Sequence, residues 1–164
     1  MEIAIIKPTT KHVEAIAAIC SAGWRQTVEG KLSEEYQNKN VMDWYNHERV
    51  KVDIEEGAYT HVALLDSRVV GVIGGGITNH LVSEVFVFYV DEKYRYKGIG
   101  RRLLNALTRE QKDKGATVQW VSVQEGNEKG FPFYEAQGFL MHEKRIGCTS
   151  TGEAFTSLRY SRKI

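Results

Sequence analysis

The sequence predicts an α+β domain built on a central mixed sheet, and three observations support this prediction. Runs of β-branched and aromatic residues recur along the chain, helical apolar stripes separate several of them, and no linker or internal repeat divides the chain. The 164 residues, of which 42% are hydrophobic, suit one domain with one continuous core. We therefore expect a single domain over residues 1–164, with about seven mostly antiparallel strands and about four flanking helices.

The first third of the chain combines one strand with a helical region. Glu2–Lys7 is rich in isoleucine and stops at Pro8, which indicates a strand. Thr9 or Thr10 can then cap a helix. The apolar stripe of this helix consists of Val13, Ile16, Ala17 and Cys20. From residue 24 to residue 57 aromatic side chains are scattered among charges, so this segment is only coarsely helical.

Three strands are expected next. Thr60–Leu65 and Val69–Ile77 flank the turn sequence at residues 66–68, which predicts an antiparallel hairpin. The glycines at 74–76 loosen the second of these strands. Val85–Val90 is apolar at every position, which predicts a strand buried on both faces in the middle of the sheet.

The rest of the chain alternates helices and strands. A helical stripe of Ile99, Leu103, Ala106 and Leu107 carries basic residues on its other positions and ends at Gly115 as a C-cap. A strand, a short helix and two final strands follow at Thr117–Val123, Lys129–Gln137, Phe139–Ile146 and Ala154–Ser161. Pro132 is tolerated only in a first helical turn, so the short helix should begin near Gly130.

Charge and cysteine usage narrow the function classes. The formal net charge of +1 gives no global field that would gather nucleic acid or an anionic membrane. Cys20 and Cys148 have no CxxC spacing and the five histidines form no metal-binding pattern, so we expect neither a disulfide nor a metal site. The N-terminus lacks the apolar core of a signal peptide, and no apolar run approaches the about 20 residues of a membrane span. We expect a cytoplasmic protein.

A glycine turn lies between the apolar strand and the basic helix. The backbone amides of Arg95–Gly100 meet the positive end of that helix, which is typical of a phosphate site. Glycine permits the close backbone approach that an anion held by successive N–H groups requires. The alternative is that these glycines only relax a tight turn. No GK[ST] sequence follows, and Leu103 replaces the third glycine of a dinucleotide fingerprint, which argues against ATP and NAD.

These residues resemble the acetyl-CoA signature of the GNAT N-acetyltransferases. The resemblance rests on Tyr89–Asp91, Tyr94–Arg95 and Lys97–Leu104, which contain the family motif [QR]xxGx[GA] in full. A second block of the family follows at the right separation and comprises Val123, Asn127, Phe133, Tyr134, Gly138 and Phe139. Together with the hairpin turn at residues 66–71, the resemblance covers residues 60–140. Gly130 departs from the pattern, because alanine is usual there.

The resemblance implies the GNAT fold, whose mixed sheet is splayed at its middle, and acetyl-CoA as the acetyl donor. In that family the pyrophosphate rests on the glycine-turn amides and the pantetheine arm pairs with the end of the preceding strand. The implied cofactor-binding residues are Phe88, Tyr89, Val90, Arg95, Tyr96, Lys97, Gly98, Ile99, Gly100, Arg101, Asn127 and Phe133. Eight Lys or Arg against four Asp or Glu between Asp91 and Lys114 suit a phosphorylated ligand.

Two residues are the catalytic candidates. Tyr134 matches the family tyrosine beside the cofactor sulfur, where a phenol can protonate the thiolate, although it can also be a core aromatic. Glu84 is a candidate base, because strand alternation places it on the face of Phe86, Phe88 and Val90 and its position resembles a base of the histone acetyltransferases. The alternatives are a solvated Glu84 and a water chain. The resemblance implies that the Val90 N–H stabilises the oxyanion.

The acceptor is expected to be a small-molecule amine. Trp24-Arg25 followed by Gly30 resembles a subgroup of small bacterial-type enzymes that includes polyamine acetylators. Between Val28 and Glu56, eight acidic residues outnumber four basic ones, which could attract a cation or could be an ordinary charged surface. The alternatives are acetylation of a protein N-terminus or lysine, and a non-catalytic acyl-CoA sensor. A homodimer is suggested by family analogy alone.

Overall fold

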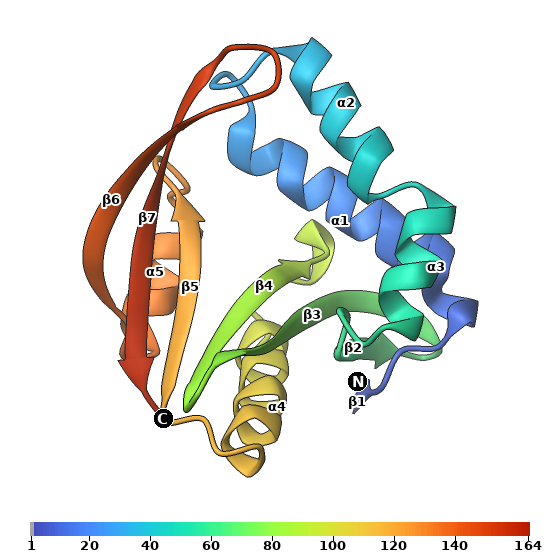
Figure 1. Ribbon diagram of the computed structural model, residues 1–164. Coiled ribbons are helices and arrows are strands. Elements are labelled where there is room, and N and C mark those ends of the chain that lie inside the picture. The colour runs from blue at the N-terminus through green and yellow to red at the C-terminus, as the bar shows by residue number, and fades with distance from the viewer. Residues whose placement is uncertain (1) are drawn as a thin grey trace.

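A computed structural model describes residues 2–164 of the chain. It contains one seven-stranded sheet with the order β1-β2-β3-β4-β5-β7-β6 (Figure 1). The strands are β1 (Ile3–Ile6), β2 (His61–Leu65), β3 (Arg68–Asn79), β4 (Val82–Val90), β5 (Val118–Gln124), β6 (Leu140–Cys148) and β7 (Ala154–Lys163). The β4–β5 pair is parallel and the other neighbouring pairs are antiparallel. The predicted mixed, mostly antiparallel sheet is confirmed.

Five α-helices flank the sheet. They are α1 (Val13–Val28), α2 (Glu34–Trp44), α3 (His47–Glu55), α4 (Ile99–Asp113) and α5 (Gly130–Ala136). The sequence predicts about four, because the segment from residue 24 to residue 57 gives no clean periodicity. This segment completes α1 and then forms α2 and α3, whose N-caps are the side chains of Ser33 and Asn46. Within residues 2–164 none of the helices is long and apolar enough to cross a membrane.

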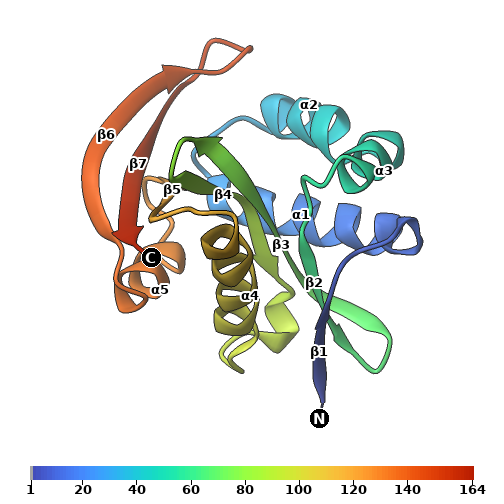
Figure 2. The same ribbon diagram turned by 60° about the horizontal axis from the view of Figure 1, so that its bottom comes forward.

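Helices cover both faces of the sheet and produce two hydrophobic cores (Figures 1 and 2). The core on the α4 and α5 side includes Ile73, Val85, Leu103, Leu107, Val121 and Phe139. The core on the α1 and α3 side includes Ile16, Cys20, Val50, Val62 and Val72. The stripes predicted for α1 and α4 therefore lie on the faces that these helices bury against the sheet, except that Ala106 is only half-buried.

The second half of strand β4 is paired along one of its two edges, and its other edge is free. Its pairing with β3 runs from Val82 to Val90, whereas its parallel pairing with β5 stops at the pair Val85–Val121. Beyond that pair the two strands diverge. The prediction that Val85–Val90 is buried on both faces is wrong at Phe86, which is 58% exposed, and Val87–Val90 are only partly buried.

A β-bulge at Phe86 changes which side chains of β4 share a face. Gly75 opposes Val85 and Gly74 opposes Val87, so Phe86 is an extra residue in this strand. A single extra residue exchanges the two faces for everything that follows it. The alternation expected from an unbroken strand therefore fails at this point.

The packing of β4 shows the consequence of the bulge. Val85, Phe88 and Val90 contact the core on the α4 side, and Val87 and Tyr89 contact the core on the α1 side. Before the bulge the odd-numbered Val85 faces the α4 side, whereas after it the even-numbered Phe88 and Val90 do. A regular strand would place Val85 and Phe88 on opposite faces.

Two polar contacts fix β4 at the point of divergence. On the α1 face the carboxylate of Glu84 accepts hydrogen bonds from both terminal nitrogens of Arg159 on β7, at 2.9 and 3.0 Å. On the α4 face the carbonyl of Glu84 accepts from Gln111 Nε2 at 3.0 Å, and Gln111 Oε1 accepts from Gln119 on β5 at 2.8 Å. Residue 84 is therefore held to both halves of the sheet just before the strands separate.

Strand β3 continues through Gly74–Gly76, although its pairing with β4 shifts register between Gly74 and Gly75, and Gly74 allows a close approach. A Cβ atom at Gly74 would lie 1.9 Å from the carbonyl oxygen of Ala58. We predict that Gly74→Ala lowers the free energy of unfolding by about 2 kcal/mol, seen as a lower melting temperature. The control is Gly76→Ala on the same face of β3, where the nearest atom would be at 3.4 Å. Equal melting temperatures for the two variants would contradict this close approach.

The Glu84–Arg159 pair gives a second prediction. The two side chains are 20% and 11% exposed, so removing the cation leaves a poorly solvated carboxylate. Arg159→Met should destabilise the fold, and Glu84→Gln in the same chain should restore part of the loss, with a coupling free energy of about 2 kcal/mol. Urea unfolding of the wild type, the two single variants and the double variant measures this coupling. Additive changes would show that the pair does not hold the strands together.

Candidate active site

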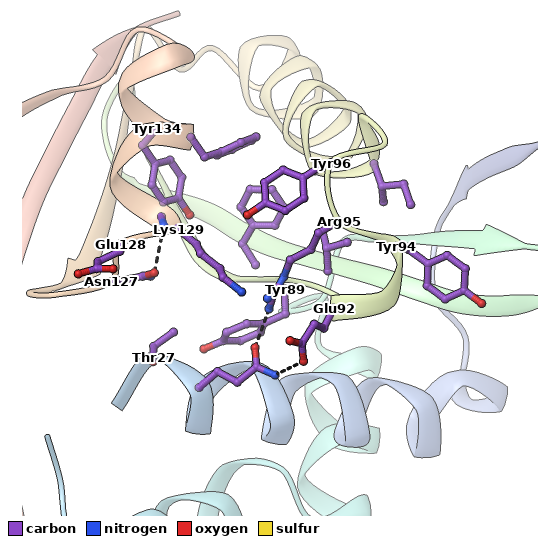
Figure 3. Close-up of a pocket in the computed structure, with 18 of the residues that line it drawn as sticks. Thr27, Tyr89, Glu92, Tyr94, Arg95, Tyr96, Asn127, Glu128, Lys129 and Tyr134 are labelled. Carbon is purple, nitrogen blue, oxygen red and sulfur yellow. Dashed lines mark hydrogen bonds between the residues drawn. The ribbon is translucent and has the colours of Figure 1, made fainter. Parts of the chain in front are cut away.

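A pocket of about 1010 Å³ lies where β4 and β5 diverge. Its walls are the C-terminal half of β4, the loop from β4 to α4, the first turn of α4, the β5–α5 turn, α5 and the last turns of α1 (Figure 3). The pocket therefore touches both halves of the sheet and the N-terminus of a long helix.

The free edge of β4 offers backbone donors to this pocket. The N–H of Asp91 donates to the Val70 carbonyl on β3 at 2.8 Å. In an antiparallel ladder alternate N–H groups point to opposite edges, so the N–H groups of Val90 and Phe88 point away from β3. They face the side on which β5 has left the sheet, where β4 pairs with no strand beyond Val85. A ligand with amide groups can pair with this edge in the manner of an added strand.

The turn after β4 offers a second set of donors. The backbone enters α4 through Gly98, whose φ of +80° is a left-handed conformation that suits glycine. Arg102 is the first residue of α4 whose N–H donates within the helix, to the Gly98 carbonyl. The N–H groups of Ile99, Gly100 and Arg101 are thus the free donors of the helix N-terminus, and they carry its positive partial charge. All three residues line the pocket.

The side chain of Arg95 extends across the pocket toward α1 (Figure 3). Its Nη2 donates to Gln26 Oε1 at 2.7 Å, and Gln26 Nε2 donates to Glu92 at 3.1 Å. Its Nη1 is buried and has no hydrogen-bond partner among the described residues. An unpaired buried guanidinium nitrogen is costly, and an anion such as a phosphate would supply the missing acceptor. This atom, the α4 donors and the β4 edge together fit a phosphorylated ligand with an amide-bearing arm.

Tyr134 projects from α5 into the aromatic wall of the pocket. Its ring packs edge to face against Phe88, Phe133 and Phe139, with centroids 6.3, 5.5 and 5.3 Å apart. Desolvation by burial raises the pKa of Tyr134 well above its ordinary value. The phenol therefore keeps its proton at neutral pH and is a hydrogen-bond donor.

Asn127 shapes the turn that precedes α5. Its Oδ1 accepts a hydrogen bond from the Gly130 N–H at 3.0 Å. A Cβ atom at Gly130 would lie 2.7 Å from Asn127 Nδ2, which explains why glycine replaces the usual alanine there. Pro132 lies in the first turn of α5, as predicted from its missing N–H.

Glu84 does not lie where the sequence placed it. Because of the bulge at Phe86, Glu84 is not on the face of Phe88 and Val90, and it does not line the pocket. Its two carboxylate oxygens are both occupied by Arg159. The face-sharing argument for a base at Glu84 is therefore wrong.

The structure brings most of the other predicted residues together. Of the predicted cofactor-binding residues, the pocket is lined by Phe88, Tyr89, Val90, Arg95, Tyr96, Gly98, Ile99, Gly100, Arg101, Asn127 and Phe133. Lys97 is outside this wall, and its ammonium lies 5.9 Å from the Tyr94 ring centroid. In residues 2–164 no group of three or more His, Cys, Asp or Glu side chains could hold a metal ion.

None of the α1 residues in the pocket wall was among the individual site residues predicted from the sequence. Gly23, Gln26, Thr27 and Glu29 line the pocket, as do Glu128 and Lys129 beside α5. The signal that could have found them is the glycine inside a helix at position 23. A Cβ atom there would lie 2.3 Å from the Tyr89 ring, so glycine lets α1 approach β4 closely.

Comparisons with known proteins agree with this geometry. The family described as "Acetyltransferase (GNAT) family" matches residues 16–139. A spermidine N(1)-acetyltransferase of Thermoplasma acidophilum is 27% identical over 148 residues, which cover 87% of this chain and 91% of that protein. A PaiA N-acetyltransferase from the same organism, solved in complex with coenzyme A, has a TM-score of 0.81 and 26% identity, and all of both chains is covered.

A more distant solved structure shows how widely this fold is shared. A ribosomal-protein-alanine N-acetyltransferase from Brucella melitensis has a TM-score of 0.71 at 22% identity, with 98% of this chain and 99% of that chain covered. The family match spans well over half of the chain. It includes the glycine turn before α4 and the β5–α5 turn with α5, which both line the pocket. The chain is an acyltransferase and belongs to the GNAT family of acetyltransferases.

Proposed function

We propose that this protein transfers the acetyl group of acetyl-CoA directly to a primary amine of a small, polyamine-like molecule. The observation that carries the proposal is the unpaired edge of β4, which ends beside the free N-terminus of α4 in one pocket. The similarity to a spermidine N(1)-acetyltransferase supports an amine acceptor of this class.

Acetyl-CoA would be held by three groups of residues. The α4 donors at Ile99–Arg101 and the unpaired Arg95 Nη1 would take the phosphates. The β4 edge at Phe88–Val90 would pair with the pantetheine amides, and Asn127, Tyr96 and Phe133 would line its path. Bound there, acetyl-CoA supplies an acetyl group that is already activated as a thioester.

The protein supplies a hydrogen-bond donor for each of the two negative charges that form during the transfer, one on the carbonyl oxygen and one on the thiolate. The Val90 N–H, which points to the free edge of β4, would stabilise negative charge on the carbonyl oxygen. The Tyr134 hydroxyl would donate its proton to the departing thiolate and would take up the proton that the attacking nitrogen releases as the amide forms, so the phenol is neutral again after the transfer. Since Glu84 is paired with Arg159, we leave it out of proton transfer and assign the loss of the ammonium proton to water.

Two carboxylates of the pocket wall could attract a cationic acceptor. Glu29 at the end of α1 and Glu128 beside α5 line the pocket, whereas Glu92 is linked to Arg95 through Gln26. Their field would draw an alkylammonium ion toward the thioester end. A protein N-terminus or lysine is the alternative acceptor, and a non-catalytic acyl-CoA sensor is the alternative from another class.

The direct test is thiol release from acetyl-CoA with a panel of polyamines, aminoglycosides, amino acids and peptides, with the product confirmed by mass. We expect turnover with an unbranched polyamine and little with the others. Preference for a peptide would favour the protein acceptor, and tight acetyl-CoA binding without any product would favour the sensor.

Tyr134→Phe separates the enzyme from the sensor. Removing the hydroxyl should lower kcat by about a hundredfold while the affinity for acetyl-CoA stays the same, because the ring still packs in the aromatic wall. Steady-state kinetics and calorimetry on the same preparation measure both quantities. Undiminished kcat would remove Tyr134 from proton transfer.

Gly98→Val tests the phosphate seat. A β-branched residue with φ near +80° is strained, and its side chain would occupy space that is open beside the α4 donors, so the dissociation constant for acetyl-CoA should rise about tenfold or more. Gly115→Val is the matched control, since Gly115 has a φ of +95° at the other end of α4 and does not line the pocket. If calorimetry gives both folded variants the wild-type affinity, the phosphates bind elsewhere.

A further inference from the structure

The short helix that carries Tyr134 depends on its neighbours for its position. α5 has seven residues and begins at a glycine. An isolated helix of this length is not stable in water, so contacts with the rest of the fold have to hold it. Its N-terminal end is held by Asn127, whose side chain accepts a hydrogen bond from the Gly130 N–H. The contact at its C-terminal end comes from β7.

Arg162 on β7 binds the end of α5, which lies beside the C-terminal end of that strand (Figure 2). Its Nη1 donates to the Gln137 carbonyl, directly after the helix, at 2.7 Å. Its guanidinium also lies over the Phe139 ring, 4.6 Å from the centroid. The Phe139 N–H donates to the Tyr134 carbonyl at 3.0 Å, and the two rings pack edge to face. Arg162 is therefore linked to Tyr134 through one intervening residue.

The other two nitrogens of Arg162 bind buried polar side chains. Nε donates to Gln119 Oε1 at 2.9 Å, and Nη2 donates to Thr108 Oγ1 at 3.0 Å. Gln119 Nε2 donates to Gln111 Oε1 at 2.8 Å, and Gln111 Nε2 donates to the Glu84 carbonyl at 3.0 Å. A continuous chain of hydrogen bonds thus runs from the end of α5 through β7, β5 and α4 to β4.

The two end groups give this chain of hydrogen bonds one direction. A guanidinium can only donate and a backbone carbonyl can only accept, whereas a glutamine amide can do either. Because Arg162 donates to Gln119 Oε1, the amide N–H groups of Gln119 have to face Gln111, and those of Gln111 have to face β4. A side chain without donors at position 162 would remove the group that fixes both amide orientations.

Stability alone is a poor explanation for Arg162. None of the ion pairs found within residues 2–164 includes it. The residue is half-buried, and desolvation lowers the pKa of its guanidinium. Taking a cation out of water without a counter-ion is costly, and a neutral side chain would avoid that cost. What a neutral side chain cannot do is bind α5, β5 and α4 at the same time.

The two donors of the proposed transfer lie on opposite halves of the sheet. The N–H of Val90 belongs to β4, and the hydroxyl of Tyr134 belongs to α5. No strand pairing joins the two halves beyond Val85, because β4 and β5 separate there. The chain of hydrogen bonds from Arg162 does join them, since it ends on α5 at one side and on Glu84 of β4 at the other.

We propose that Arg162 is a positioning residue, which sets the place of the Tyr134 hydroxyl relative to the free edge of β4. Arg162 does not line the pocket, so it acts through α5 and the buried amides. The inference rests on the proposed function, because the step that it affects is proton transfer at Tyr134. A misplaced catalytic group slows the chemical step and leaves cofactor binding at the β4 edge and the α4 donors intact.

The test combines Arg162→Met with Tyr134→Phe. Arg162→Met should lower kcat about tenfold, with the KM for acetyl-CoA unchanged. In a chain that already carries Tyr134→Phe it should lower kcat less than about twofold, because no hydroxyl is left to position. The matched control is Arg145→Met, since Arg145 is exposed on β6 and pairs with Glu143. This control should leave kcat unchanged in both backgrounds.

Arg162→Lys provides a second variant in case Arg162→Met does not fold. A lysine keeps the charge, but its ammonium cannot reproduce the planar fork that reaches the Gln137 carbonyl, Gln119 and Thr108 together. Its kcat should therefore also fall, and the loss should again vanish in the Tyr134→Phe background. Wild-type kcat in the Arg162 variants, or an equal loss in both backgrounds, would overturn the inference.

Amide hydrogen exchange reports the anchoring of α5 without turnover. The N–H groups of Gln137 and Phe139 donate to carbonyls of the last turn, so they should be protected in the wild type and in Arg145→Met. Both should exchange faster in Arg162→Met, and unchanged exchange would overturn the inference. If the wild type acetylates no amine, the proposed function fails. The exchange rates then decide alone whether Arg162 holds the helix that carries Tyr134.

Discussion

The separation of β4 from β5 is the constraint on which the rest of the site depends. A strand inside a sheet normally has both edges paired, and unpaired backbone groups away from water are costly. Here the edge of β4 beyond Val85 remains paired on one side only, and the pocket occupies the other. The neighbouring elements serve this gap: α4 begins at its mouth, α5 lines it with aromatic rings, and α1 closes its other side.

The gap between β4 and β5 has to be held by fixed contacts at its ends, because the two diverging strands would otherwise pair with each other or move apart. At the narrow end residue 84 is bound through its side chain to β7 and through its carbonyl to Gln111 of α4. Gln111 and Gln119 are 1% and 0% exposed, so this contact lies in a poorly solvated place where hydrogen bonds are strong. A carboxylate that looked like a base in the sequence is better explained as part of the frame that holds the reacting groups apart.

Features that depend on residues close together in the sequence could be predicted, whereas features that depend on contacts between residues far apart in the sequence could not. The glycine turn, the basic helix and the start of α5 follow from residues within a few positions of each other. The Glu84–Arg159 pair joins residues 75 apart, and no local pattern announces it. The bulge at Phe86 is invisible in a run of apolar residues, because valine and phenylalanine fit either face. The helices α2 and α3 could not be predicted as separate elements, because α2 buries no residue and so has no apolar stripe.

In the binding mode proposed here, the free donors of β4 and of α4 form one binding surface for acetyl-CoA. The most direct test is an amide NMR titration of the 15N-labelled protein with coenzyme A. We expect the amide signals of Phe88, Val90, Ile99, Gly100 and Arg101 to shift together with one dissociation constant, while the signal of the Gly115 amide at the far end of α4 does not move. Shifts confined to other segments, with these five amides unchanged, would contradict it.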